Sequence, residues 1–132
     1  MAQPVLILYI DDDQEDVEIF KSTLAAIDSS IICLTAHNGQ EGLDILSDGV
    51  VLPDLVFLDI NMPILNGRDC LVAIRKDSRF KEIPIIMYST SSALQDKKYC
   101  LTVGANEYLC KSGNVATAQE ELRGVLMKFG AI

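Results

Sequence analysis

The sequence has no tryptophan, no CxxC cysteine pair and no apolar run near the ~20 residues that a membrane-spanning helix needs. Its first ten residues also lack the basic segment that opens a signal peptide. These absences argue against a membrane protein and a secreted disulfide scaffold, and they predict a cytoplasmic protein. We interpret the four cysteines as small apolar core residues in a reducing compartment rather than as metal or redox sites.

Basic residues are scarce in the first half of the chain. Residues 1–66 contain twelve acidic residues and a single base, Lys21, whereas residues 67–132 contain seven acidic and ten basic residues. With a net charge of -8, the protein lacks the positive field that a primary nucleic-acid partner requires. The six carboxylates between positions 11 and 18 form either a solvated helix surface or part of a cation site, and charge alone leaves both interpretations open.

Apolar residues make up 49% of the sequence, which is enough for one compact domain over residues 1–132. Five apolar runs predict strands at residues 5–10, 31–35, 55–58, 83–88 and 107–110. Because these runs are apolar on both sides of the pleat, they are typical of parallel strands that helices cover on both faces.

Segments with helical spacing of apolar residues lie between the predicted strands and after the last one. The expected N-caps are short polar residues that precede these helices: Asn38, Asn66, and Ser91 or Ser92. The helix after residue 92 bears Leu94 and Leu101, and the last helix covers about residues 115–129. Five βα units joined by right-handed crossovers predict an α/β fold, a doubly wound five-stranded parallel sheet in the order 2-1-3-4-5 with flavodoxin-like (βα)5 architecture.

Polar residues follow or end four of the predicted strands. Asp11 and Asp12 follow the first strand, Asp59 the third, Ser89 the fourth and Lys111 the fifth. In a doubly wound sheet, ligands bind outside the carboxyl ends of the strands. We therefore expect these five side chains to converge in one crevice beside the first strand.

The chemistry of this set is that of phosphoryl transfer. Three neighbouring carboxylates repel one another unless a cation lies between them. A site with only oxygen ligands suits Mg²⁺, which neutralises phosphoryl oxygens and allows an anionic carboxylate to attack phosphorus. Lys111 supplies a second positive charge, and the Ser89 hydroxyl supplies a hydrogen bond. The set therefore predicts phosphoryl transfer to an aspartate.

Four segments carry a family resemblance: ILYIDDD, DLVFLDINMP, PIIMYST and GANEYLCKS. In their order and spacing, with 30 residues from Asp59 to Ser89 and 52 from Asp59 to Lys111, the chain resembles the receiver domains of two-component response regulators. It is similar in particular to single-domain members such as the chemotaxis response regulator. The resemblance covers essentially the whole chain and implies a single receiver domain, residues 1–132, with no effector domain.

The resemblance implies a phosphoacceptor and a metal site. Asp59 corresponds to the phosphoacceptor of the family. Asp12, Asp59 and the backbone carbonyl of Asn61 correspond to the ligands of Mg²⁺, for which Mn²⁺ can substitute, and Asp11 acts largely through water.

The resemblance also implies a switch. Ser89 takes the position of the conserved hydroxyl, Lys111 that of the invariant lysine and Tyr108 that of the aromatic switch residue. Once Asp59 is phosphorylated, Ser89 and Lys111 are expected to move toward it and Tyr108 to turn inward. Where the family usually has a cis proline after the lysine, this chain has Ser112, so the Lys111–Ser112 peptide bond is either trans or a strained cis bond.

The partners that the resemblance implies are proteins. The phosphodonor is a phosphohistidine on a sensor histidine kinase or a phosphotransfer protein, and the domain catalyses its own phosphorylation and dephosphorylation without being an enzyme in the usual sense. The output surface is the face formed by the fourth helix, the fifth strand and the fifth helix, which binds a downstream protein. The domain is expected to be a monomer or a phosphorylation-dependent dimer, without a nucleic-acid or membrane partner.

Three other functions compete with this interpretation. A phosphatase with an Asp-x-Asp nucleophile motif would use Asp11, Asp12 and Asp13, but that motif normally ends in Thr or Val where this chain has Glu15. A receiver that acts only as a scaffold needs no acidic set, and this chain has the full set. A flavodoxin-like FMN carrier is disfavoured because the three aspartates would repel the phosphate.

Overall fold

The computed structural model describes residues 3–132, in which five strands and five α-helices alternate along the chain. The strands are β1 (Leu6–Ile10), β2 (Ile32–Ala36), β3 (Leu55–Leu58), β4 (Ile85–Ser89) and β5 (Glu107–Cys110). The helices are α1 (Gln14–Ile27), α2 (Gly39–Asp48), α3 (Gly67–Lys76), α4 (Leu94–Val103) and α5 (Val115–Lys128), with a 3-10 turn at Ser78–Phe80. All strand pairs are parallel, and the order β2-β1-β3-β4-β5 confirms the predicted doubly wound sheet.

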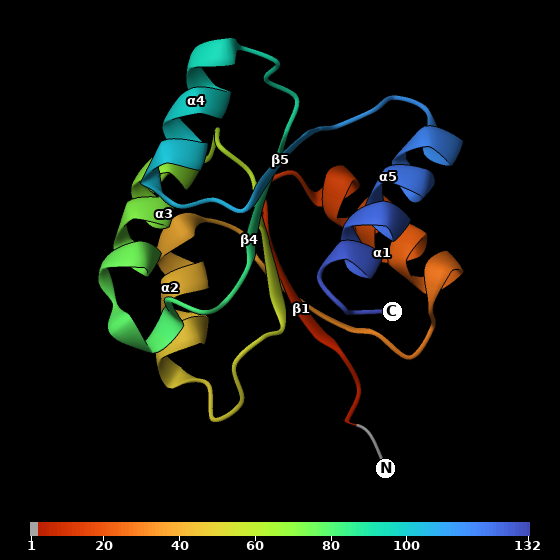
Figure 1. Cartoon of the computed structure of the whole chain (residues 1–132), viewed down its shortest axis with the longest axis horizontal. Coiled ribbons are helices and arrows are strands. Elements are labelled where there is room, and N and C mark those ends of the chain that lie inside the picture. Colours follow the sequence, from red (N-terminus) through yellow and green to blue (C-terminus); the bar gives the residue numbers. More distant parts are fainter. Residues whose placement is uncertain (1–2) are drawn as a thin grey trace.

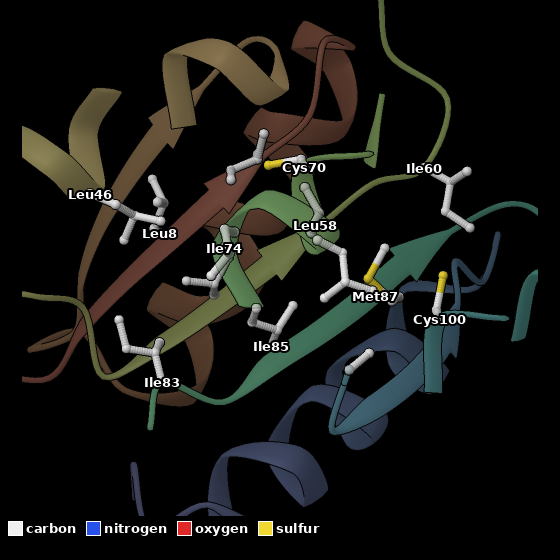
Figure 2. Close-up of a cluster of buried hydrophobic side chains, with 14 of the residues drawn as sticks. Leu8, Leu46, Leu58, Ile60, Cys70, Ile74, Ile83, Ile85, Met87 and Cys100 are labelled. Atoms are coloured by element: carbon white, nitrogen blue, oxygen red, sulfur yellow. The ribbon is translucent and has the colours of Figure 1, made fainter. Parts of the chain in front are cut away.

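Helices cover both faces of the sheet, with α2, α3 and α4 on one side and α1 and α5 on the other (Figure 1). Successive residues of a strand point to opposite faces, so Leu8 and Ile10 belong to one apolar layer and Ile7 and Tyr9 to the other. Figure 2 shows side chains of the first layer between the strands and the helices that pack on them. No helix within residues 3–132 is long and apolar enough to cross a membrane.

Polar side chains cap four of the helices. Asp13, Asn38, Asn66 and Asn114 each accept a hydrogen bond from a backbone N–H in the first turn of the helix that follows. The predicted caps Asn38 and Asn66 are therefore confirmed.

The predicted N-cap of the fourth helix was wrong. The N-cap of α4 is Ala93, which makes no side-chain hydrogen bond, whereas the Ser91 hydroxyl donates to Asp96 at 2.7 Å. Leu94 and Leu101 do not face the core, since they are 62% and 40% exposed, and Cys100 is the buried residue of this helix. Short polar side chains near a helix start have several possible hydrogen-bond partners, and the sequence alone does not rank them.

The outer strand and two cysteines also depart from expectation. As an edge strand, β2 has helices over only part of its surface, and Ile32 and Leu34 are exposed.

Cys70 and Cys100 are buried as predicted, and burial raises the pKa of Cys70 to about 12. Cys33 is only half-buried and Cys110 is exposed, so the interpretation of all four cysteines as core residues was wrong for these two.

Helix α3 begins in direct contact with the backbone of Asp59. The Gly67 amide donates to the Ile60 carbonyl at 2.8 Å. A Cβ atom added at Gly67 would lie 1.9 Å from the Asp59 carbonyl oxygen and 2.8 Å from the Ile60 Cα. Only glycine allows this approach, because the atoms that it meets are backbone atoms and cannot turn away.

We predict that Gly67→Ala lowers the free energy of unfolding by more than about 2 kcal/mol, because the new methyl group displaces the start of α3 from the Asp59 backbone. The matched control is Gly124→Ala in α5, where an added Cβ meets nothing within 4 Å. That change should stabilise the protein by roughly 0.5–1 kcal/mol, since alanine favours a helix interior. Urea unfolding followed by circular dichroism measures both, and similar effects in the two variants would contradict the prediction.

Candidate functional site

The sheet ladder continues one residue beyond several strands and so fixes the backbone of the polar residues at their ends. The Asp11 amide donates to the Ala36 carbonyl at 2.9 Å, and the Asp59 amide donates to the Ile10 carbonyl at 3.0 Å. The Lys111 amide donates to the Ser89 carbonyl at 2.7 Å. The strand order therefore brings together, at one edge, residues that are far apart in the sequence.

Three carboxylates form an acidic cluster at this edge. Oxygens of Asp11, Asp12 and Asp59 lie within 4.8 Å of one another. Asp11 is fully buried and Asp59 is 7% exposed, whereas Asp12 faces solvent. Burial raises the pKa of Asp59, the Lys111 ammonium opposes this, and the Asp11 charge adds to the rise.

Asp11 is held by three hydrogen-bond donors. Its Oδ2 accepts from the Tyr9 hydroxyl at 2.5 Å and from Lys111 Nζ at 2.5 Å, and its Oδ1 accepts from the Asp13 amide at 3.0 Å. Tyr9 is itself buried and stacks on Phe20 with ring centroids 4.0 Å apart. Burial and the hydrogen bond to Asp11 raise the pKa of Tyr9, so its hydroxyl stays a donor.

The ammonium of Lys111 compensates the acidic cluster. Its Nζ lies 2.5 Å from Asp11, 2.8 Å from Asp16 and 3.4 Å from Asp59, and the side chain is only 10% exposed. Burial by itself would lower the pKa of Lys111, but the hydrogen bonds to Asp11 and Asp16 outweigh it and hold the pKa above its usual value. The lysine is therefore a permanent cation in this site.

Asp16 and Tyr9 belong to this site, and sequence reasoning missed both. The sequence left open whether Asp16, one of the six carboxylates between positions 11 and 18, lies on a solvated helix surface or in a cation site. Its position was a usable signal, because Asp16 lies in the first turn of α1, the helix that begins four residues after the end of β1. Nothing in the sequence distinguished Tyr9 from the apolar residues around it.

The acidic cluster suits a hard divalent cation. Its donors are all carboxylate oxygens, as Mg²⁺ prefers, and solvent reaches the cluster through the exposed Asp12. Asn61 lies two residues beyond Asp59 in the loop between β3 and α3 and is exposed. The loop that carries Asn61 therefore begins within the acidic cluster, at Asp59.

Ser89 and Tyr108 are connected through the loop between β4 and α4. Ser89 is fully buried, and its hydroxyl oxygen accepts from the Ser91 amide at 3.2 Å. Tyr108 is 8% exposed, and its hydroxyl donates to the Ser91 carbonyl at 2.8 Å. The exposed Cys110 donates to the same carbonyl at 3.4 Å. Hydrogen bonds to Ser91 therefore connect Ser89 with Tyr108, the two predicted switch residues. The Lys111–Ser112 peptide bond is trans, as are the other peptide bonds within residues 3–132.

Residues 7–123 match the response regulator receiver domain family. The chain belongs to this family. Chemotaxis protein CheY1 of Helicobacter pylori is 35% identical over 122 residues, which cover 91% of this receiver chain and 95% of that protein. Transcriptional regulatory protein CpxR of Escherichia coli is 34% identical over 122 residues, which cover 92% of this chain. The receiver spans about half the length of CpxR, 49%.

Solved structures of response regulators share the receiver fold. The phosphorylated cyanobacterial phytochrome response regulator RcpA superposes with a TM-score of 0.89 at 26% identity, over 97% of this chain and 95% of that one. The family and the strand order agree, so the chain is a receiver of two-component signalling.

We predict that Lys111→Met lowers the free energy of unfolding by about 3 kcal/mol in metal-free buffer, because the buried Asp11 carboxylate loses its cation. The control is Lys128→Met, which removes an exposed ion pair with Glu107. That pair should contribute less than about 1 kcal/mol. Urea unfolding in the presence of EDTA measures both variants, and an equal loss would show that Lys111 does not stabilise the acidic cluster.

Proposed function

We propose that this receiver accepts a phosphoryl group on Asp59 from a phosphohistidine of a sensor histidine kinase or a phosphotransfer protein. The observation that carries the proposal is that Asp11, Asp12 and Asp59 converge in one acidic cluster beside the Lys111 ammonium. RcpA, a structural relative, is described in its phosphorylated form. We propose Mg²⁺ as the metal, held by Asp12, Asp59 and the backbone carbonyl of Asn61, with Asp11 acting through water and with Mn²⁺ as a substitute.

Asp59 is the carboxylate best suited to attack phosphorus. Both oxygens of the buried Asp11 already accept short hydrogen bonds, and Asp12 lies in the exposed part of the cluster. Asp59 Oδ1 accepts from the Ile60 amide at 2.8 Å, which orients the carboxylate, whereas Oδ2 accepts from Lys111 at the longer distance of 3.4 Å. The Asp59 carboxylate is therefore oriented through Oδ1, and Oδ2, which has the longer hydrogen bond, is the oxygen that can attack.

In the proposed transfer, Asp59 Oδ2 forms a bond to phosphorus as the bond between phosphorus and the histidine nitrogen breaks. The imidazole leaves with the electron pair of that bond. Lys111 neutralises charge on the phosphoryl oxygens, and the Ser89 hydroxyl donates to them. Mg²⁺, when bound, neutralises charge on the same oxygens. Attack of water on phosphorus later releases inorganic phosphate and restores Asp59, so the domain catalyses its own phosphorylation and dephosphorylation.

The proposed output passes through the loop between β4 and α4. A phosphoryl group on Asp59 attracts Ser89, whose hydroxyl accepts from the Ser91 amide, and Ser91 in turn holds the Tyr108 hydroxyl. A shift of this loop changes the face formed by α4, β5 and α5, where Leu94 and Leu101 are exposed. We propose that a downstream protein binds this face and that the receiver is a monomer or a phosphorylation-dependent dimer.

With acetyl phosphate and Mg²⁺, the intact protein should gain about 80 Da, the mass of one phosphoryl group. Asp59→Asn should abolish this gain because it removes the nucleophilic oxygen, and intact-protein mass spectrometry measures it. An adduct that survives Asp59→Asn but disappears in Asp11→Asn would favour a phosphatase with Asp11 as nucleophile. No adduct in the wild-type protein under any condition would favour a scaffold.

Asp12→Ala should weaken Mg²⁺ binding by more than about tenfold, because it removes a direct oxygen ligand. Glu15→Ala is the matched control, since Glu15 is an exposed carboxylate three residues further along and is not part of the acidic cluster. Isothermal titration calorimetry with MgCl₂ compares the two variants. Equal losses of affinity would mean that general negative charge, and not a ligand at Asp12, attracts the metal.

A further inference from the structure

Asp16 occupies one hydrogen-bonding position of the Lys111 ammonium. Its Oδ2 lies 2.8 Å from Nζ, closer than the Asp59 oxygen at 3.4 Å. Asp11 takes another position at 2.5 Å. A lysine ammonium has three donors, so all of them already point at carboxylates in this structure.

A phosphoryl group on Asp59 needs the same ammonium. It brings a charge of about -1.5 to -2 and three acceptor oxygens into the site. Asp11 cannot readily release Lys111, since it is fully buried and also bound by Tyr9 and the Asp13 amide. The Asp16 side chain is 32% exposed, so water can solvate its carboxylate once the contact with Lys111 breaks.

A cavity beside the ammonium provides room for this change. It has a volume of about 250 Å³, and its lining includes Asp16, Tyr88, Thr90, Lys111 and Ser112. Gly113, two residues after the lysine, is exposed, and an added Cβ there would meet nothing within 4 Å. Neither the Asp16 side chain nor the loop that carries Lys111 is tightly packed on this side.

We propose that Asp16 is a positioning residue that competes with the phosphoryl group of Asp59 for Lys111 and thereby lowers the affinity of the site for that group. The inference rests on the proposed function, since it requires that Asp59 be the phosphoacceptor. Two effects act in the same direction. Asp16 holds the ammonium at a shorter distance than Asp59 does, and its own negative charge repels the phosphoryl oxygens.

The test uses beryllofluoride, a stable mimic of a carboxylate-bound phosphoryl group, with saturating Mg²⁺ and the whole chain. Asp16→Asn removes the charge and keeps a side chain of the same shape, and it should bind beryllofluoride about tenfold more tightly than the wild-type protein. Asp16→Glu keeps a carboxylate and should stay close to the wild-type affinity. Isothermal titration calorimetry measures all three proteins.

Glu15→Gln is the matched control, because it removes one charge from the same turn of α1 at a residue whose side chain does not contact Lys111. Its affinity for beryllofluoride should stay within about twofold of wild type, as expected for a screened surface charge. An unchanged or weaker affinity in Asp16→Asn, or an equal gain in Glu15→Gln, would overturn the role of Asp16. Failure of the wild-type protein to bind beryllofluoride with Mg²⁺ would instead overturn the proposed function, and the role of Asp16 with it.

Discussion

The ion pair between the Lys111 ammonium and the Asp11 carboxylate fixes the arrangement of the strand ends that form the acidic cluster. It joins residues 100 positions apart in the sequence and pairs a carboxylate that is 0% exposed with a lysine side chain that is 10% exposed. A buried carboxylate without a cation is strongly unfavourable, so the sheet is compatible with Asp11 only if the end of β5 lies near the end of β1. Because β3 and β4 lie between these strands, the same requirement brings Asp59 and Ser89 into the site.

The fold was largely predictable because its signals are local and redundant. Doubly covered strands are apolar throughout, and asparagine caps mark helix starts, so the strand order followed from the alternation of these elements. The failures occurred where local signals are weak. The serines before α4 have several possible partners, and the Leu94 and Leu101 side chains lie on a helix with almost no apolar face in the core. Exposure of Ile32 in β2 depends on the reach of a neighbouring helix, which no local pattern encodes.

The site was predictable for a different reason. Asp11, Asp12, Asp59 and Lys111 follow strand ends, and topology alone places strand ends of a parallel sheet at one edge. Asp16 and Tyr9 were missed because their roles depend on side-chain direction. Asp16 is one of several acids at the start of α1, and only the position of the ammonium distinguishes it from Glu15. Tyr9 was expected to be buried, but its hydroxyl has a polar partner only because Asp11 turns back toward it.

The close approach of Gly67 to the Asp59 backbone makes the packing on the two sides of Asp59 unequal. On one side, the start of α3 is in backbone contact with Asp59 and Ile60, with no side chain between them to absorb a displacement. On the other side, the Asp59 carboxylate contacts Lys111, which follows β5 and borders a cavity, and Ser89 at the end of β4 accepts a hydrogen bond from the loop that follows it. Asp59 is therefore closely packed on the α3 side and less closely packed on the Lys111 side. Under the proposed function, a phosphoryl group on Asp59 is accommodated by movement on the Lys111 side, because the backbone contact leaves no room for movement toward α3.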